Sequence, residues 1–308
     1  MSERALDYVL WIGGGSGAGK TTVARAISRR YDIELYAADA RGYAHLARFT
    51  GSDRPAESPD ERWLLPTPKE LAQRFLLASA EKFPLVLEDL TALDGDTLII
   101  AEGPTMLPDL IRPHLASPEH ALYLVPTDEF SERLLMLRGG GRTLGTSDPE
   151  RAHTNLLARN RILNSTIRER ALSLDLPVIE VDDSLTLEET ERLIADRFAT
   201  LLAAGPRAVD GEQRRRIRLR ENTAVHTNVL AYLRDIGVED LDAAPPLALS
   251  CECLRLGCTA EIRVPPGRFS AVRSRPGQYV VLGGHEAVGE VVVGAVGEAS
   301  VVEARTES

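Results

Sequence analysis

The sequence of 308 residues contains three cysteines, three lysines and only 5% aromatic residues. It has no apolar stretch approaching the roughly 18 residues that a membrane-spanning helix requires. The apolar segment at 8–12 runs directly into glycines and is too short for a signal peptide. We therefore expect a cytoplasmic protein without a membrane partner.

Positive charge is also scarce. The chain has 36 Lys and Arg residues against 46 Asp and Glu residues, a net charge of −10. A broad nucleic-acid-binding surface needs an excess of basic side chains to neutralise phosphates, so this balance argues against one. The remaining composition, 44% hydrophobic and 27% charged, is typical of a globular chain that can bury a full core. Its length allows two domains.

Short apolar runs alternate with helical spacing through the first two thirds of the chain. A helix is predicted to start at Asp148 and Pro149, which suit the cap and the first turn, and its apolar face continues to Ala171. Five strands alternating with helices predict an α/β fold with a five-stranded parallel sheet flanked by helices. The predicted strands are 8–12, 33–37, 97–101, 121–125 and 177–181.

The most specific signal is a glycine-rich loop between the first predicted strand and helix. Residues 14–21 read Gly-Gly-Ser-Gly-Ala-Gly-Lys-Thr and match the phosphate-binding P-loop pattern G-x-x-x-x-G-K-[ST]. This chain's own composition predicts roughly 0.002 accidental matches. A flexible glycine turn without a ligand is the alternative, and the strand-loop-helix context argues against it.

The loop suits a nucleoside triphosphate with Mg²⁺. Glycines let backbone N–H groups converge on phosphates, and the following helix directs its positive dipole end at the same anion. Lys20 is expected to bridge the β- and γ-phosphates, and the Thr21 hydroxyl to bind the magnesium ion. The predicted ATP-binding residues are Gly14, Gly15, Ser16, Gly17, Ala18, Gly19, Lys20, Thr21 and Thr22.

On these residues the segment 1–204 resembles the P-loop small-molecule kinases, including the nucleoside, nucleoside-monophosphate and uridine-kinase-like enzymes. In that group the second strand commonly ends in an aspartate near the acceptor hydroxyl. Here Tyr36-Ala37-Ala38-Asp39 ends the second strand. The resemblance implies that Asp39 binds the acceptor and acts as general base. A simple turn or helix cap is the alternative.

The third strand ends in Glu102-Gly103, similar to the Glu-Gly that uridine-kinase-like enzymes place beside the P-loop. Glu102 stands where an aspartate is commoner. The resemblance implies that this carboxylate supports Mg²⁺ through a bound water. The alternative is a solvated residue at the end of a strand.

Arginines and glycines between 130 and 161 suggest a lid that closes over ATP. Arg138 and Arg142 flank three glycines and are the predicted catalytic arginines that neutralise transferring charge. Arg151, Asn155 and Arg159 fall on one helical face and form a second candidate set of phosphate or acceptor contacts. Solvated arginines on an exposed face are the alternative for each of them. The segment 40–80 is the expected acceptor-binding region.

The C-terminal part differs in character. Residues 205–246 are predicted to form a linker with an arginine-rich amphipathic helix, and 247–308 a small β-rich module. On a strand, Cys251 and Cys253 would face the same side, and Cys258 returns five residues later. With His285 they would complete a Cys3His structural zinc site. Three buried metal-free thiols are the main alternative, and a redox role is another.

The run Cys-x-Cys-x4-Cys followed by Gly-Gly-His resembles a module found in uncharacterised bacterial proteins, which implies a portable unit without a known activity. Such a unit could bind a protein partner or a second subunit. It could also only cap the N-terminal domain.

Together these features predict a small-molecule kinase that moves the ATP γ-phosphoryl group to a hydroxyl or phosphate of an unidentified acceptor. A nucleotide-dependent regulatory switch or ATPase acting through the C-terminal module is a second hypothesis. A nucleic-acid end kinase that docks through residues 214–220 is a third.

Overall fold

The computed structural model describes residues 6–50, 57–137, 143 and 145–304. The chain forms two compact units. Unit 1 contains 1–24, 47–95 and 100–204, and unit 2 contains 25–46, 96–99 and 205–308. The predicted boundary at 204 coincides with a unit boundary, but two earlier segments group with the C-terminal part. The domain division at 204 and 246 stays a prediction.

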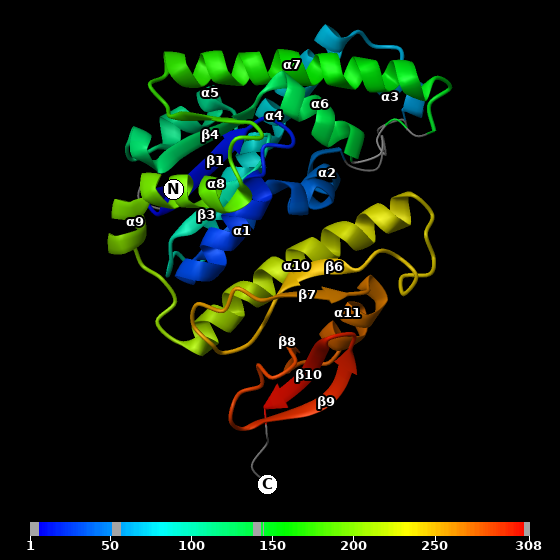
Figure 1. The fold of residues 1–308 in the computed structure, drawn as a ribbon. Coiled ribbons are helices and arrows are strands. Elements are labelled where there is room, and N and C mark those ends of the chain that lie inside the picture. Colours follow the sequence, from blue (N-terminus) through cyan, green and yellow to red (C-terminus); the bar gives the residue numbers. More distant parts are fainter. Residues whose placement is uncertain (1–5, 51–56, 138–142, 144, 305–308) are drawn as a thin grey trace. The chain divides into compact units, whose positions relative to one another are not determined.

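A five-stranded parallel sheet flanked by helices carries the N-terminal part of the chain, which confirms the predicted fold class (Figure 1). The strand order is β2-β3-β1-β4-β5, so β1 is central and its neighbours come from later in the sequence. The strands are β1 (Val9–Gly14), β2 (Glu34–Ala37), β3 (Ile99–Glu102), β4 (Ala121–Pro126) and β5 (Val178–Val181). Each predicted strand therefore exists, shifted by at most two residues at either end.

The central strands are buried along their whole length, as expected for a parallel sheet covered on both faces. Among the described residues, no helix is both long and apolar enough to span a bilayer. The helices up to residue 204 are α1 (Lys20–Tyr31), α2 (Gly42–Thr50), α3 (Pro59–Trp63), α4 (Pro68–Thr91), α5 (Pro108–Ile111), α6 (Asp128–Leu137), α7 (Pro149–Ser173), α8 (Leu187–Arg197) and α9 (Ala199–Ala204). The 3-10 turns within the described residues include η2 (Ala38–Arg41), η4 (Arg112–His114) and η5 (Pro118–His120).

Helix α7 begins as the sequence predicts. Asp148 caps it by accepting a 3.1 Å hydrogen bond from the backbone N–H of Arg151, and Pro149 occupies the first turn, where its missing N–H costs nothing. The predicted apolar face, from Leu156 through Ile167 to Ala171, is buried. Within unit 1, α7 contacts α4, β4, α5 and α6 (Figure 1).

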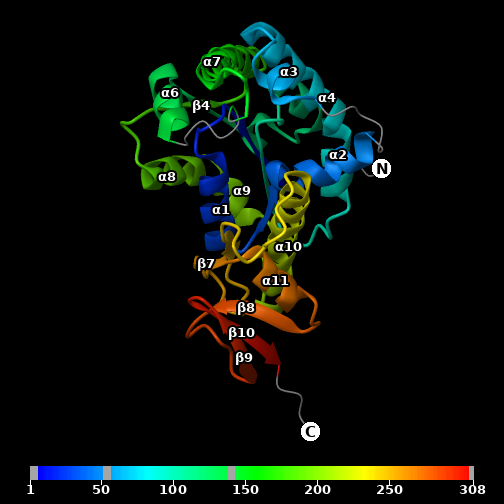
Figure 2. The same cartoon turned by 90° about the vertical axis from the view of Figure 1, so that its right-hand side faces the viewer.

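The C-terminal part of unit 2 contains one long helix, one short helix and two small antiparallel sheets (Figure 2). A core of Leu249, Val264, Phe269 and Val301 joins the sheets to the short helix. The β-rich character was predicted; the short helix was not. The elements are α10 (Gly211–Asp235), β6 (Leu247–Ser250), β7 (Glu261–Val264), α11 (Pro266–Arg273), β8 (Gln278–Leu282), β9 (Glu290–Val296) and β10 (Ala299–Ala304).

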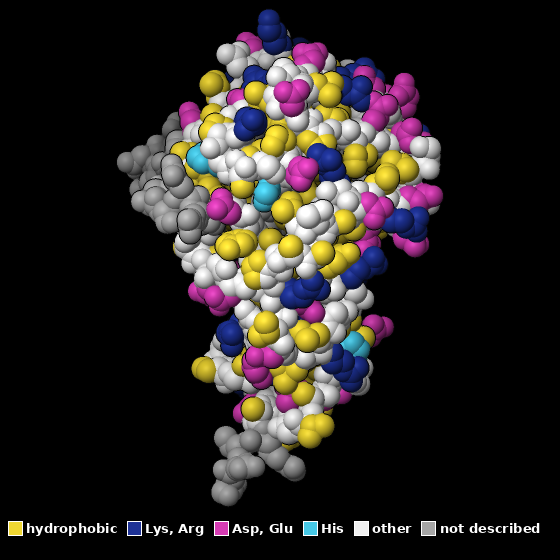
Figure 3. Space-filling view, turned by 90° about the vertical axis from the view of Figure 1, so that its left-hand side faces the viewer, with side chains coloured by type: hydrophobic (Ala, Val, Ile, Leu, Met, Phe, Trp, Pro, Cys, Tyr) yellow, Lys and Arg dark blue, Asp and Glu magenta, His cyan; other side chains and the backbone are white. Residues whose placement is uncertain are grey.

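The arginine-rich helix predicted after residue 205 is present as α10, and part of its arginine run is buried. Arg214 and Arg218 are fully buried and Arg215 nearly so. Arg218 donates to Glu221 and to the backbone carbonyls of Ser28 and Ile33. On the face shown in Figure 3, basic and acidic side chains are interspersed. Three of the five arginines in the segment 214–220 are therefore not available to a nucleic acid, which weakens the end-kinase hypothesis.

Candidate functional site

The P-loop joins β1 to α1, the arrangement that the motif requires. Its first glycine is fixed by a close backbone approach. At Gly14, φ is +126° and a Cβ atom would lie 1.9 Å from the carbonyl oxygen of Leu124 in β4. The next residue, Gly15, donates its N–H to that same oxygen at 2.9 Å. Gly17 and Gly19 also have positive φ, at +87° and +77°, which glycine adopts without strain.

Lys20 is the first residue of α1 and is 6% exposed. Its Nζ donates a 2.6 Å hydrogen bond to the carbonyl oxygen of Gly15, so the ammonium group lies folded over the loop. The first turn of α1 reads Lys-Thr-Thr-Val and so adds only positive or neutral side chains to the positive end of the helix dipole. The loop therefore concentrates donors and positive charge where an anion would bind.

Thr21 and Glu102 are brought together by the sheet order, which places β3 beside β1. The Thr21 hydroxyl donates a 3.0 Å hydrogen bond to Oε1 of Glu102, and Glu102 is 1% exposed. A hydroxyl and a carboxylate in contact offer the oxygen ligands that Mg²⁺ prefers. The two residues predicted to support magnesium are thus neighbours, and their metal role stays a prediction.

Sequence reasoning missed one residue at this loop. Asn164 lies in the middle of α7 and is 4% exposed. A Cβ atom on Gly15 would lie 2.2 Å from Oδ1 of Asn164, so the amide packs directly on the loop. Its Nδ2 donates a 3.5 Å hydrogen bond to the carbonyl oxygen of Pro126. No local pattern marks an asparagine in a long helix as a neighbour of residue 15.

The structure does not test the roles of the other predicted catalytic residues. Asp39 lies in the 3-10 turn η2, directly after β2, and its side chain is exposed. It belongs to unit 2, and its role as base stays a prediction. Arg138 and Arg142 lie outside the described residues, so the lid arginines also stay a prediction.

Two of the three residues in the second candidate set on α7, Asn155 and Arg159, make internal contacts, whereas Arg151 is exposed. Asn155 donates to the backbone carbonyl of Leu64 at 3.1 Å. Arg159 is 7% exposed, and its guanidinium lies 4.7 Å from the centroid of the Phe75 ring. These contacts hold α7 to the segment around α4, so a structural role accounts for both residues.

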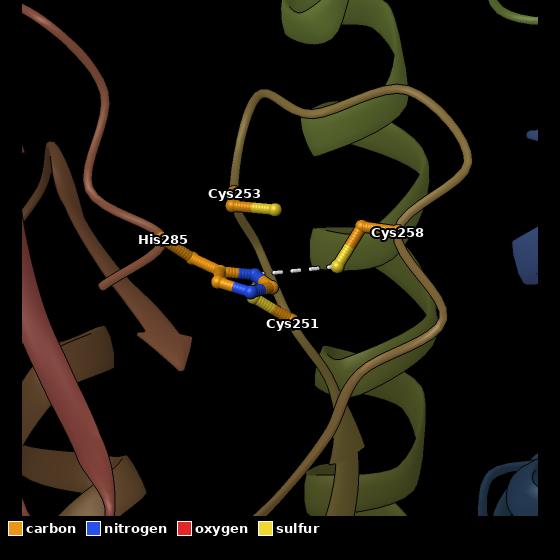
Figure 4. A group of neighbouring side chains, drawn as sticks. All are labelled: Cys251, Cys253, Cys258 and His285. Carbon is orange, nitrogen blue, oxygen red and sulfur yellow. Dashed lines mark hydrogen bonds between the residues drawn. The ribbon is translucent and has the colours of Figure 1, made fainter. Parts of the chain in front are cut away.

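The three cysteines and His285 form a second cluster, in unit 2. One ligand atom from each residue lies within 4.8 Å of all the others, and the four side chains point toward one another (Figure 4). The cysteines are buried. Cys251 and Cys253 lie in the loop after β6 and not on a strand, so the prediction that a strand places both thiols on one side was wrong. The two thiols are nevertheless close together. The donor set fits a metal site.

The three thiols shift one another's pKa values in different directions. Hydrogen bonds with Cys253 and Cys258 raise the pKa of Cys251, and hydrogen bonds with Cys251 and Cys253 lower the pKa of Cys258. A hydrogen bond with Cys251 lowers the pKa of Cys253, but its hydrogen bond with Cys258 and its burial raise that pKa overall. The buried cation of Arg214 lies near Cys253, with 3.8 Å between Nη1 and Sγ. Burial raises the pKa of Asp32, the ion-pair partner of Arg214, although two hydrogen bonds act in the opposite direction.

Comparison with known proteins adds no family. No family model matches the chain, and no curated protein matches it. An uncharacterised protein from Eubacterium ventriosum is 14% identical with a TM-score of 0.32, over 63% of this chain and 99% of that one. The structure of deoxyadenosine kinase from M. mycoides with bound dATP is 15% identical with a TM-score of 0.37, over 62% of this chain and 98% of that one. Likeness at this level carries no information about activity.

Proposed function

We propose that this protein is an ATP-dependent phosphotransferase that moves the γ-phosphoryl group to a hydroxyl or phosphate of a small molecule. The observation that carries the proposal is the contact between Thr21 of the P-loop and the buried carboxylate of Glu102. A P-loop alone supports phosphate binding. A P-loop whose threonine meets an acidic side chain supports binding of a phosphate together with Mg²⁺.

The chain's own groups supply what phosphoryl transfer demands, which is positioning and charge stabilisation. Backbone N–H groups of the loop and the dipole of α1 would hold the β- and γ-phosphates. Lys20 would leave the carbonyl of Gly15 and turn to the terminal phosphates, where a charge-assisted bond is stronger. Thr21 and Glu102 would hold Mg²⁺, which neutralises the charge that develops on the leaving group.

The reaction forms a bond between the acceptor oxygen and the γ-phosphorus and breaks the bond from that phosphorus to the β–γ bridging oxygen. ADP leaves with the bridging oxygen. When the acceptor is a hydroxyl, its proton goes to a base, and Asp39 is our candidate because it follows the C-terminal end of a sheet strand, where open α/β sheets bind ligands. Replacement of Asp39 by Asn should lower turnover far more than ATP affinity.

The test uses the full-length chain with Mg²⁺ and γ-labelled ATP. Thermal shift with a non-hydrolysable ATP analogue would first screen nucleosides, nucleoside monophosphates, sugars, sugar acids and aminoglycoside-like antibiotics. Transfer of label is then measured for each compound that adds to the shift. We expect label to appear on one class of acceptor, and to disappear in the Lys20→Ala variant. Absence of any ATP–Mg²⁺ binding would overturn the proposal.

The regulatory switch is the second outcome of the same assay. In that case ATP turnover would be insensitive to every small molecule, and label would appear only in free phosphate. One observation favours the switch hypothesis. Within unit 2, Asp32, the residue after helix α1, accepts hydrogen bonds from Arg214 and from Gly257 in the cysteine loop. ATP turnover stimulated by a single metabolite decides for the kinase.

A further inference from the structure

We propose that Cys251, Cys253, Cys258 and His285 bind one Zn²⁺ ion, and that Arg214 and Asp32 form the hydrogen-bonded shell that orients these ligands. This site is separate from the proposed phosphotransfer and stands without it. Its role is structural, since all four coordination positions of a tetrahedral ion are taken by protein and none is left for a substrate.

The distances agree with a tetrahedral centre. Zn–S bonds of about 2.3 Å and Zn–N bonds of about 2.0–2.1 Å at tetrahedral angles place sulfur and nitrogen about 3.6 Å apart. Nδ1 of His285 lies 3.6 Å from Sγ of Cys251 and 3.5 Å from Sγ of Cys258. Figure 4 shows all four side chains directed at one central point.

Ordinary hydrogen bonding explains this arrangement poorly. An imidazole Nδ1 has either one hydrogen or one lone pair, so it can serve one thiol but not two at equal distance. A disulfide is also a poor description, because it would pair two cysteines and strand the third beside them. Three thiols and one imidazole nitrogen around a common point match one soft four-coordinate ion.

Hydrogen bonds from neighbouring residues hold the backbone and one thiol of the three cysteines. The guanidinium of Arg214 donates to the backbone carbonyls of all three cysteines, at 3.1 Å for Cys251, 2.7 Å for Cys253 and 2.9 Å for Cys258. One fully buried side chain thus fixes the three residues that carry the thiols. The N–H of Leu282 donates to Sγ of Cys251 at 3.2 Å, which fixes the direction of that thiolate. Such outer contacts orient metal ligands.

Three thiolates, a neutral imidazole and Zn²⁺ would carry a net charge of −1. The buried guanidinium of Arg214 lies beside them and is also paired with Asp32. Asp32 then anchors the guanidinium, with Nε of Arg214 donating to Oδ1 at 3.2 Å. Its second oxygen accepts a 2.6 Å hydrogen bond from the N–H of Gly257, in the turn between Cys253 and Cys258.

Asp32 has φ of +50°, a left-handed conformation that aspartate tolerates as a single residue. Hydrogen bonds from Arg214 and from Gly257 hold its carboxylate in place. Asp32 directly follows α1, so the cysteine loop is tied to the end of the helix that begins at Lys20. We infer that the metal keeps this loop in the shape that Asp32 and Arg214 bind.

The experiment measures metal and thiols in the full-length chain, purified under reducing conditions without chelator. We expect one zinc per chain, three thiols that resist a thiol-reactive disulfide reagent, and reaction of all three after a strong chelator is added. Replacement of zinc by Co²⁺ should give the d–d bands of a tetrahedral site and thiolate-to-cobalt charge-transfer absorption. These readouts use the unmodified protein, so they do not depend on whether a variant folds.

Variants locate the site. Cys258→Ser should remove about one third of the charge-transfer intensity, and His285→Ala should keep that intensity but change the d–d bands; His114→Ala, in unit 1, is the control and should alter neither. The Arg214→Gln variant should bind the metal with about 10–100-fold lower affinity, measured against a competing chelator. Arg216 is an exposed neighbour, and Arg216→Gln should leave the affinity unchanged.

Three outcomes would overturn the proposal. One is folded protein without stoichiometric metal after zinc is supplied under reducing conditions. Another is thiol reactivity that a chelator leaves unchanged. The third is a stable disulfide between two of the cysteines in the freshly purified chain.

Discussion

Thr21 and Glu102 are separated by 81 positions in the sequence and joined by a 3.0 Å hydrogen bond between hydroxyl and carboxylate. Thr21 lies in the first turn of α1 and Glu102 ends β3, so the parallel neighbours β1 and β3 create the contact. If this pair holds Mg²⁺, Thr21→Ala and Glu102→Gln should each raise the magnesium concentration needed for half-maximal turnover. Nucleotide affinity measured without magnesium should change little.

The two effects should not add. Both variants remove parts of one ligand set, so a double-mutant cycle on magnesium dependence should give a coupling energy of about 0.5–3 kcal/mol. Thr166→Ala is the matched control, because this hydroxyl bonds only to a backbone carbonyl of its own helix among the contacts described. Strict additivity of the two variants would argue that Thr21 and Glu102 do not share an ion.

Lys20 in the P-loop can be compared with Lys82 in α4, which serves as the control. Lys20→Ala should lower turnover by about 100-fold or more, because a donor aimed at developing charge is lost. Its melting temperature should stay close to that of the natural protein, since the hydrogen bond described for Nζ is to a backbone carbonyl of the loop. Lys82→Ala removes the same charge from α4 and should leave turnover unchanged. Equal activity of the two variants would remove Lys20 from the mechanism.

The P-loop glycines should differ in what they contribute to stability. Alanine at position 14 would place Cβ 1.9 Å from a backbone oxygen, whereas alanine at position 19 would meet nothing within 4 Å. We expect Gly14→Ala to cost about 3 kcal/mol or more of unfolding free energy, and Gly19→Ala only the backbone strain of about 1–2 kcal/mol. Urea denaturation of the two variants measures the difference. Equal losses would contradict the close approach between β1 and β4.

Buried arginines in α10 should act as core residues. Arg218 is fully buried and donates to Glu221 at 2.6 Å. Arg218→Ala should cost about 3–5 kcal/mol, because it leaves a buried carboxylate without its counter-charge. Arg216 is exposed two positions earlier, and Arg216→Ala should stay within about 0.5 kcal/mol. Similar small losses from both would show that the run is a surface feature after all.

A helix cap gives a prediction about pH. Glu70 in the first turn of α4 accepts hydrogen bonds from the N–H and hydroxyl of Thr67, which lower its pKa. A lowered pKa means that the folded state favours the carboxylate. Its stabilisation is therefore present above the ordinary pKa near 4.5 and is lost as pH falls through the lowered value.

The measurement compares melting temperatures of the natural chain and Glu70→Ala from neutral to acid pH. The variant should be less stable at neutral pH, and the difference should shrink as the pH falls below the lowered pKa of Glu70. Glu81→Ala, at an exposed site on the same helix, should show a smaller difference with a weaker pH dependence. A constant difference for Glu70→Ala across this range would exclude an ionised cap.

Much of the N-terminal architecture was predictable because its signals are local. Apolar runs of strand length bounded by glycine or by turns gave the five strands, and Asp148 with Pro149 gave the start of α7. The P-loop lies where strand and helix signals meet. The arginine run misled for a physical reason: periodicity predicts that α10 is a helix, but not that buried carbonyls and carboxylates will surround its guanidinium groups.

The sequence by itself determined the alternation of strands and helices, the glycine loop with Lys20, and the presence of three cysteines and one histidine in the C-terminal segment. Each of these depends on residue type and spacing within a few positions. Only the tertiary structure decided that Thr21 donates a hydrogen bond to Glu102, that Asn164 packs on Gly15, and that Arg214 donates hydrogen bonds to the carbonyls of three cysteines. Those contacts join residues tens to more than a hundred positions apart, and the sheet order and the burial of α10 create them.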